Sequence, residues 1–120
     1  MYVYSQSTGE LREDGVLLGK GYSGAGLDKN VPADEVVSCQ GPLPQGFYTI
    51  AGPRDDPKKG PCVFDLSPDD DNDMFGRTGF MIHGDSLSHP GMASEGCIVL
   101  GLLIRQRIAV SVDRRLQVIE

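Results

Sequence analysis

FMIHGDSLSHPGMASEGCIVL, residues 80–100, places an imidazole and a thiol next to two short apolar runs. The first run, Phe80–Ile82, leads to His83, and the second run, Ile98–Leu100, follows Cys97. Short apolar runs joined by a segment rich in Gly, Ser and Pro are typical of strands joined by a loop. A cysteine nucleophile needs a neighbour that takes its proton near neutral pH, and histidine can do so. This stretch therefore predicts a Cys/His catalytic pair at the ends of two strands.

The whole chain sets limits on the class of protein. Its 120 residues predict a single domain, residues 1–120, with a core of its own. The formal net charge of −6 offers no basic surface for nucleic acid or anionic lipid, and no apolar run has membrane-spanning length. The first residues lack the basic start and apolar region of a secretory signal. We therefore expect a monomer that is made in the cytoplasm and does not insert into membranes.

Composition and patterning predict a mostly-β fold with one short helix. Sixteen glycines and eight prolines favour short strands and turns. Asp14-Gly15 between apolar segments predicts a hairpin turn within an antiparallel meander over residues 2–23. The other expected elements are a helical turn near Pro32–Val36, strands at 47–50, 62–66 and 79–82, a polar loop at 53–61, a helix at about 100–110 and a last strand at Leu116–Ile119. The helix is expected to bury Leu100, Leu103, Ile104 and Ile108 and to turn Arg105 and Gln106 away from the core.

Two further features allow more than one interpretation. Cys39 and Cys62 could form a disulfide in an oxidising compartment and leave Cys97 free, or both could be small buried hydrophobes. The acidic run Asp69–Asp73 fails the pattern of an EF-hand loop, because Met74 stands where the loop needs glycine. We interpret that run as a solvated acidic turn.

Two motifs together resemble the signature of the L,D-transpeptidase (YkuD-like) family. His83-Gly84 matches its histidine-glycine pair, and Ser94–Cys97, SEGC, matches its Ser-x-Gly-Cys element. Pro44–Ile50, PQGFYTI, is similar to an upstream strand of that family. Phe75–Asp85 and the block around the cysteine resemble most closely a compact branch, the L,D-transpeptidase-like toxins delivered by type VI secretion.

The resemblance implies a fold, a reaction and a substrate. The fold would be an L,D-transpeptidase-like β-sandwich with a short helix after the catalytic cysteine. Cys97 would attack the bond between diaminopimelate and D-alanine in tetrapeptide stems of peptidoglycan, with His83 as base and Ser94 fixing the cysteine turn. Backbone N–H groups of Gly96 and Cys97 would bind the oxyanion. Hydrolysis would give L,D-carboxypeptidase activity, and attack by an amine would give transpeptidation or D-amino-acid exchange, with no cofactor and no metal.

The same resemblance leaves the recognition of the substrate carboxylate unassigned. Typical members place an arginine two residues after the cysteine, where this chain has Val99. Another cation must then supply the positive charge, or the substrate is engaged differently. Arg77 and Arg54 are the candidates, and we expect Arg77 to bind the carboxylate. The other interpretation is that Arg77 pairs with the acidic run Asp69–Asp73. The other expected substrate-binding residues are Tyr22, Gly84, Asp85 and His89. For Asp85, orienting His83 and capping a turn both stay open.

A toxin of this kind would act in the periplasm of a target cell and would have a cognate immunity protein and a secretion or tail component as partners. Two other classes of protein remain open at this point. One is a catalytically inactive module that binds peptidoglycan or docks on a phage tail or secretion apparatus. The other is a zinc hydrolase that uses His83, Asp85, His89 and Cys97.

Overall fold

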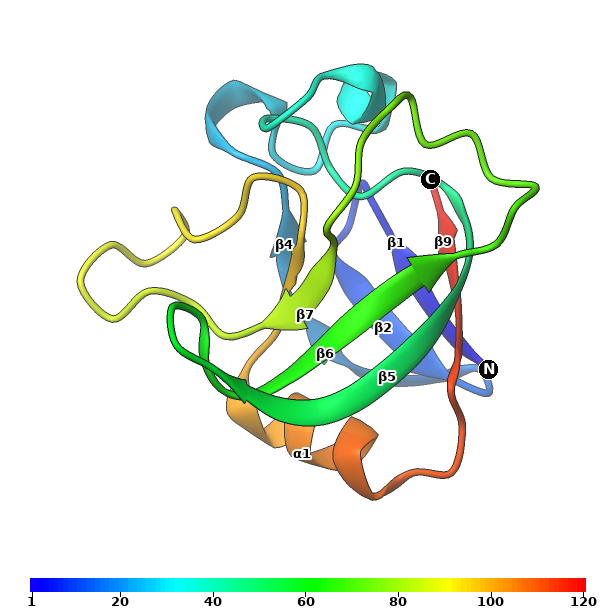
Figure 1. Cartoon of the computed structure of the whole chain (residues 1–120), viewed down its shortest axis with the longest axis vertical. Coiled ribbons are helices and arrows are strands. Elements are labelled where there is room, and N and C mark those ends of the chain that lie inside the picture. The colour runs from blue at the N-terminus through cyan, green and yellow to red at the C-terminus, as the bar shows by residue number, and fades with distance from the viewer.

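Nine strands form one sheet in the computed structural model, which describes residues 1–120. The strands are β1 (Tyr2–Ser5), β2 (Glu10–Glu13), β3 (Val16–Lys20), β4 (Tyr22–Ser23), β5 (Gly46–Asp56), β6 (Gly60–Pro68), β7 (Met81–His83), β8 (Ile98–Val99) and β9 (Arg115–Ile119). Their order in the sheet is β3-β2-β1-β9-β5-β6-β7-β8-β4. Since Gly21 alone separates β3 from β4, the two edges of the sheet meet in the chain and the sheet curls into a nearly closed barrel (Figure 1).

The expected meander is confirmed for its first three strands. β1 pairs antiparallel with β2, and β2 pairs antiparallel with β3. Asp14 and Gly15 join these last two strands with φ values of 49° and 85°, as the tight turn requires. The fourth strand leaves the meander, because Tyr22 pairs with Val99 of β8 at the opposite edge of the sheet.

The core lies inside the curled sheet and follows the alternation of side chains along the strands. Tyr2 and Tyr4 of β1 point inward beside Leu116 and Val118 of β9, which runs parallel to β1. Full burial of an aliphatic side chain such as Leu116 or Val118 contributes roughly 1.5–3 kcal/mol to folding. The remaining members of the cluster come from the other strands, the loops and the helix: Leu11, Leu43, Tyr48, Ile50, Phe64, Leu66, Phe80, Ile82, Ile98, Leu100 and Ile108.

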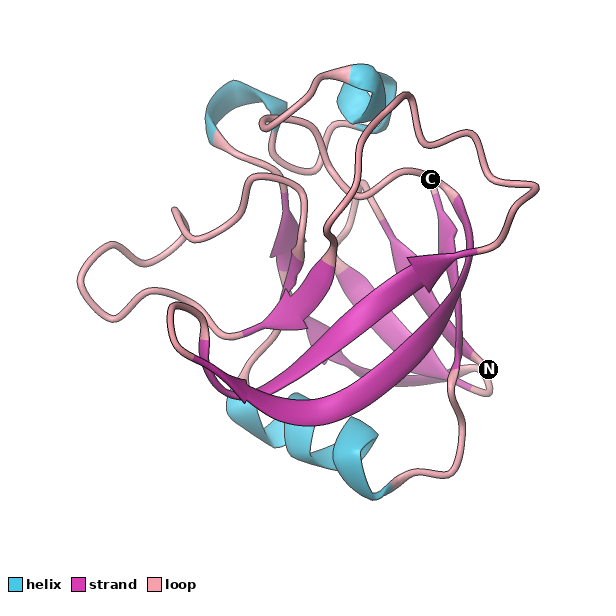
Figure 2. Cartoon of the chain, in the orientation of Figure 1, coloured by secondary structure: helices cyan, strands magenta, loops and turns pink.

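The polar loop expected at residues 53–61 is wrong, because most of it is strand. β5 runs to Asp56 and β6 starts at Gly60, so the two strands form a long curved hairpin (Figure 2). Pro53 and Pro61 each fall between paired positions where the register shifts. A proline fits at such a bulge because its nitrogen is not needed for the ladder. The hairpin tip therefore belongs to a defined strand pair.

The helix α1 (Leu102–Val110) follows β8, as expected, but its buried face differs from the expected one. Leu103 is 82% exposed, whereas Arg105 is only 7% exposed. The guanidinium of Arg105 is buried because it donates hydrogen bonds to the carbonyls of Leu100, Pro61 and Cys62. Carbonyl partners of this kind remove the cost of burying a charged group. No helix of the structure is long and apolar enough to cross a membrane.

The disulfide alternative for Cys39 and Cys62 is wrong, because all three cysteines are free thiols. Cys62 is half-buried beside the core, but Cys39 is exposed, so the alternative that both are buried also fails for Cys39.

The 3-10 helices η1 (Gly26–Asp28) and η2 (Pro32–Val36) lie at the end of the barrel opposite α1 (Figure 2). The helical turn expected near Pro32–Val36 is thereby confirmed.

Candidate active site

Two adjacent parallel strands deliver the histidine and the cysteine. β7 pairs with β8 so that Ile82 lies opposite Ile98 and His83 opposite Val99, which places Cys97 level with Met81. Residues two apart in a strand share one face of the sheet, so Cys97 and His83 face the same side. The Met81 N–H donates to the Cys97 sulfur at 3.3 Å. The register of two short strands therefore places His83 and Cys97, the pair expected from the sequence, on the same face of the sheet.

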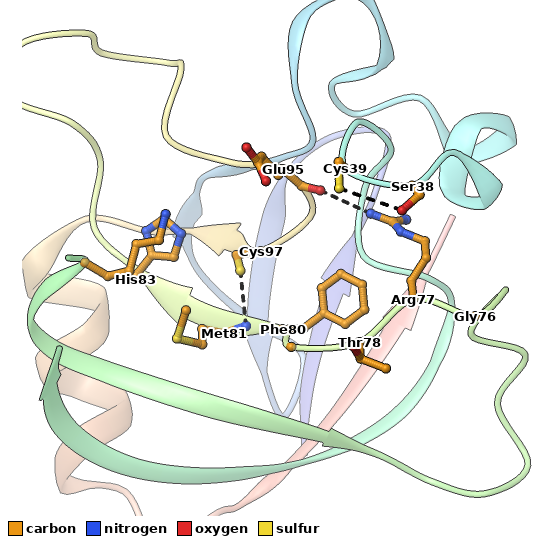
Figure 3. A pocket seen from close by; sticks show the side chains of 12 residues that line it. Ser38, Cys39, Gly76, Arg77, Thr78, Phe80, Met81, His83, Glu95 and Cys97 are labelled. Carbon is orange, nitrogen blue, oxygen red and sulfur yellow. Dashed lines mark hydrogen bonds between the residues drawn. The ribbon is translucent and has the colours of Figure 1, made fainter. Parts of the chain in front are cut away.

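That face opens into a cavity of about 360 Å³ (Figure 3). His83 and Cys97 line it together with the segment that leads into β7 and the tip of the β5–β6 hairpin. The full set of lining residues is Ser38, Cys39, Lys59, Gly76, Arg77, Thr78, Gly79, Phe80, Met81, His83, Glu95 and Cys97. A cavity that contains both a thiol and an imidazole is the arrangement that nucleophilic catalysis needs.

The hydrogen bond of His83 fixes which ring nitrogen is available as a base. Nδ1 lies 2.7 Å from the carbonyl of Gly84, and since a carbonyl can only accept, Nδ1 carries the proton and donates it. Nε2 is buried and has no hydrogen-bond partner in the protein. Burial lowers the pKa of His83 below its ordinary value of 6.5. The ring is therefore neutral at pH 7, with its free lone pair on Nε2.

Burial has the opposite effect on the pKa of Cys97, because it disfavours the charged thiolate. The pKa of this thiol is raised above its ordinary value of 9.0, although the Met81 N–H and the positive charge of Lys59 oppose the rise. The resting pair is thus a neutral thiol and a neutral imidazole. Such a pair reacts when His83 takes the thiol proton as the new bond forms.

Ser94 organises the turn that carries the cysteine. Its hydroxyl accepts hydrogen bonds from the N–H groups of Gly24 at 2.9 Å and Gly96 at 3.0 Å, and donates to the Cys97 carbonyl at 2.6 Å. The role expected for Ser94 agrees with these contacts. The expectation that the Gly96 N–H faces an oxyanion is wrong in this structure, because Ser94 already occupies that donor. The backbone N–H of Cys97 makes no hydrogen bond within the protein and is the donor that remains.

Arg77 lines the cavity, but its guanidinium faces the protein. It is 5% exposed and donates to the carbonyls of Glu35, Pro42, Gly41 and Glu95. These bonds satisfy the group internally and tie the segment around residue 41 to the cysteine turn. Neither expectation for Arg77 therefore holds, since it is not a free cation and it does not pair with the acidic run. The sequence shows an arginine at position 77, but it does not indicate which backbone carbonyls accept hydrogen bonds from that guanidinium.

The glycines beside Cys97 and His83, Gly96 and Gly84, each lie against a buried arginine. A Cβ on Gly96 would lie 2.5 Å from Nη2 of Arg77, and the φ of 142° at this position also excludes other residues. A Cβ on Gly84 would lie 2.6 Å from Nη2 of Arg105. Gly84 and Gly96 therefore support the site by allowing close packing, and neither lines the cavity.

Tyr22 and Asp85 hold the loop between β7 and Cys97, away from the cavity. The Tyr22 hydroxyl donates to the Asp85 carboxylate at 2.6 Å and accepts from the Ala93 N–H at 2.9 Å. Asp85 also accepts from the N–H of Gly91, so it caps a turn; it does not orient His83, whose Nδ1 bonds to a carbonyl. Asp85, Tyr22 and His89 do not line the cavity.

Val99 occupies the position that is typically arginine, and its side chain carries no charge. It is 3% exposed and paired with Tyr22 on one side and His83 on the other, inside the sheet. No group of three or more His, Cys, Asp or Glu side chains is arranged to hold a metal ion. The residues His83, Asp85, His89 and Cys97 therefore do not gather as the zinc alternative requires.

Three lining residues that carry chemistry were not expected from the sequence. Lys59 reaches the cavity from the hairpin tip, Glu95 from the cysteine turn and Cys39 from the segment after η2. The basic pair Lys58-Lys59 between two strand-like segments was the available signal for the lysine. It was overlooked because the proline-rich surroundings indicated an extended loop.

The fold and cavity define a mostly-β domain with a Cys/His pair facing a cavity. The model of the Tlde1 domain family matches residues 19–118, which covers both members of the pair. The chain belongs to this family of type VI secretion effectors, which is L,D-transpeptidase-like. The match supports the effector branch of the resemblance rather than the YkuD-like family at large. No curated protein matches the chain.

Proposed function

We propose that this protein is a cysteine enzyme that modifies peptidoglycan, acting on tetrapeptide stems at the bond between diaminopimelate and D-alanine. The observation that carries the proposal is the shared cavity of Cys97 and His83, in which the imidazole presents an unpartnered Nε2. Membership in an L,D-transpeptidase-like effector family supports the choice of substrate.

The proposed reaction starts from the neutral pair. The Cys97 sulfur attacks the scissile carbonyl carbon while His83 Nε2 takes the thiol proton. The oxyanion forms beside the Cys97 N–H, a preorganised donor of the kind that typically contributes about 3 kcal/mol to transition-state stabilisation. His83 then returns the proton to the departing amine of D-alanine, which leaves a thioester on Cys97. Water completes an L,D-carboxypeptidase reaction, and an amine completes transpeptidation or D-amino-acid exchange.

The proposed biological role is that of an antibacterial toxin delivered by type VI secretion. Its place of action would be the periplasm of a target cell, where peptidoglycan stems are exposed. The effector family implies secretion machinery and a cognate immunity protein as partners. An immunity protein that blocks the cavity would protect the producing cell.

Mass spectrometry of muropeptides tests the proposal directly. Incubation of the purified protein with tetrapeptide-containing peptidoglycan should yield tripeptide stems, exchanged stems or cross-linked dimers. Cys97→Ala should yield none of these while retaining the circular dichroism spectrum of the wild type. Unchanged muropeptides with the wild-type protein, or full activity of Cys97→Ala, would contradict the proposal.

A further inference from the structure

The charged side chains that line the cavity differ in whether they are free to bind a ligand. Three lining residues have side chains that carry a formal charge: Lys59, Arg77 and Glu95. Arg77 already donates to four backbone carbonyls. The Lys59 ammonium makes no hydrogen bond or salt bridge within the protein, and only its backbone N–H is engaged. Lys59 is therefore the cavity's available cation.

The backbone at Lys59 is held in place although its ammonium is free. The Asp56 carboxylate accepts hydrogen bonds from the N–H groups of Lys58 at 3.0 Å and Lys59 at 2.9 Å. Arg54 in turn donates to Asp56 at 2.9 Å and to Asp65 of the neighbouring strand. This network fixes the hairpin tip, so the side chain of Lys59 extends from a defined backbone position at the cavity. Lys58 belongs to the same turn but does not line the cavity.

The electrostatic effect of Lys59 on the catalytic pair agrees with this placement. Burial is the main cause of both pKa shifts, raising that of Cys97 and lowering that of His83. Among the charged groups, Lys59 lowers both values, as a nearby positive charge must. Its ammonium thus acts on the sulfur and on the imidazole together.

We propose that Lys59 is a specificity-determining residue that binds a carboxylate presented next to the bond under attack. For the reaction this means the terminal carboxylate of the acyl-donor stem, an assignment that rests on the proposed function. In a peptide the scissile carbonyl and the carboxylate of the following residue are separated by one residue, about 4 Å. The cation must then line the same cavity as Cys97, and Lys59 does. Glu95 also lines the cavity. Its negative charge repels the substrate carboxylate and thereby favours binding of that carboxylate at Lys59.

Lysine fills the role that the buried valine at position 99 cannot fill. A carboxylate left unpaired in a partly desolvated cavity is costly, and an ammonium removes that cost. The cation reaches the cavity from the hairpin tip and not from the strand after the cysteine. Recognition of the stem thus depends on a hairpin distant from the catalytic motifs in the sequence.

Two synthetic stems that differ only at the C-terminus test the proposal. One ends in the free carboxylate of D-alanine and the other in its amide. For the wild type, kcat/KM should be about ten- to a hundredfold higher for the acid than for the amide. Lys59→Gln should lose most of this preference, and Lys59→Arg should restore it. Lys58→Gln is the matched control and should keep the wild-type ratio. An unchanged ratio in Lys59→Gln would overturn the proposal.

A thiol-alkylation assay separates this proposal from the proposed function. Iodoacetate and iodoacetamide each form a bond between the Cys97 sulfur and carbon and release iodide, but only iodoacetate carries a carboxylate. The quantity of interest is the rate with iodoacetate divided by the rate with iodoacetamide at Cys97, measured by peptide mass spectrometry to exclude Cys39. This ratio should be lower in Lys59→Gln than in the wild type and unchanged in Lys58→Gln. If the ratio falls in this way but the wild-type protein processes no stem, the carboxylate site is retained and the enzymatic proposal is rejected. Equal ratios in wild type and Lys59→Gln would reject the carboxylate site even if stems are processed.

Discussion

Nη2 of Arg77 donates a hydrogen bond to the carbonyl of Glu95 at 3.2 Å, two residues before Cys97. The same atom donates to Gly41 at 2.9 Å, so one guanidinium joins the segment after η2 to the cysteine turn. Arg105 has the corresponding position beside the histidine, where it packs against Gly84. Cys97 and His83 are thus each supported by a buried arginine that bonds to backbone carbonyls.

Arg77→Gln is expected to destabilise the protein and to reduce activity at the same time. Several buried carbonyls lose their donor, and a buried acceptor without a partner costs about 1–3 kcal/mol. We expect a loss on the order of 3 kcal/mol in the free energy of unfolding, measured by urea denaturation. Arg107→Gln is the control, because Arg107 is an exposed residue whose ion pair with Glu13 is 3.3 Å long.

A different result for Arg77→Gln would change its assignment. If the free energy of unfolding matched that of Arg107→Gln while kcat/KM fell, Arg77 would be a substrate ligand despite its internal bonds. Equal values of both quantities in the two variants would show that the carbonyl contacts contribute little.

Ser94→Ala is expected to loosen the cysteine turn. The substitution removes the acceptor of the Gly24 and Gly96 N–H groups and the donor to the Cys97 carbonyl. A small displacement of a nucleophile can cost up to about a hundredfold in rate, so kcat/KM should fall by at least about tenfold. Ser67→Ala, at an exposed position of β6, is the control and should behave as wild type. Wild-type kinetics of Ser94→Ala would show that the turn keeps its shape without the hydroxyl.

The parts of the structure that the sequence predicted depend on local chemistry. Asp14-Gly15 specifies a tight turn because only a few residues adopt two successive positive φ values. His83 and Cys97 were recognised because each directly adjoins an apolar run, and both runs are strands. Such features are contained within a few consecutive residues, so no knowledge of the three-dimensional fold was needed.

The parts that were mispredicted depend on contacts between distant segments. Arg105 was assigned to the solvent-exposed face of the helix, but carbonyls of Pro61 and Cys62 bury it. Backbone carbonyls are present at every residue, so no sequence pattern indicates which of them will meet a guanidinium. Lys59 was missed for a related reason, because the hairpin that carries it contains prolines placed at bulges.

His83, at the end of β7, and His89, in the loop that follows, offer a comparison of the two histidines of the chain. His83→Gln should lower kcat/KM by at least about a hundredfold, since the general base is lost while polar volume is kept. His89→Ala should retain most of the activity, because His89 is exposed, does not line the cavity, and its ring bonds only to Ser88 of its own loop. Steady-state kinetics on a tetrapeptide stem provides the measurement, and circular dichroism checks the fold. Equal losses in the two variants would mean that the base is misassigned.

The dependence of activity on pH tests whether the resting pair is neutral. Only neutral His83 can take the thiol proton, and that form dominates above its pKa, which burial lowers below the ordinary 6.5. Burial also raises the pKa of Cys97 above 9.0, so the thiol persists throughout the neutral range. As pH rises, kcat/KM should therefore increase with a midpoint below pH 6.5 and then stay level to about pH 9. His89→Ala should show the same profile, which would assign the acid limb to His83. A profile that instead falls as pH rises through the neutral range would indicate a resting thiolate–imidazolium pair, because that form is lost when the imidazolium, whose pKa an adjacent thiolate raises, gives up its proton.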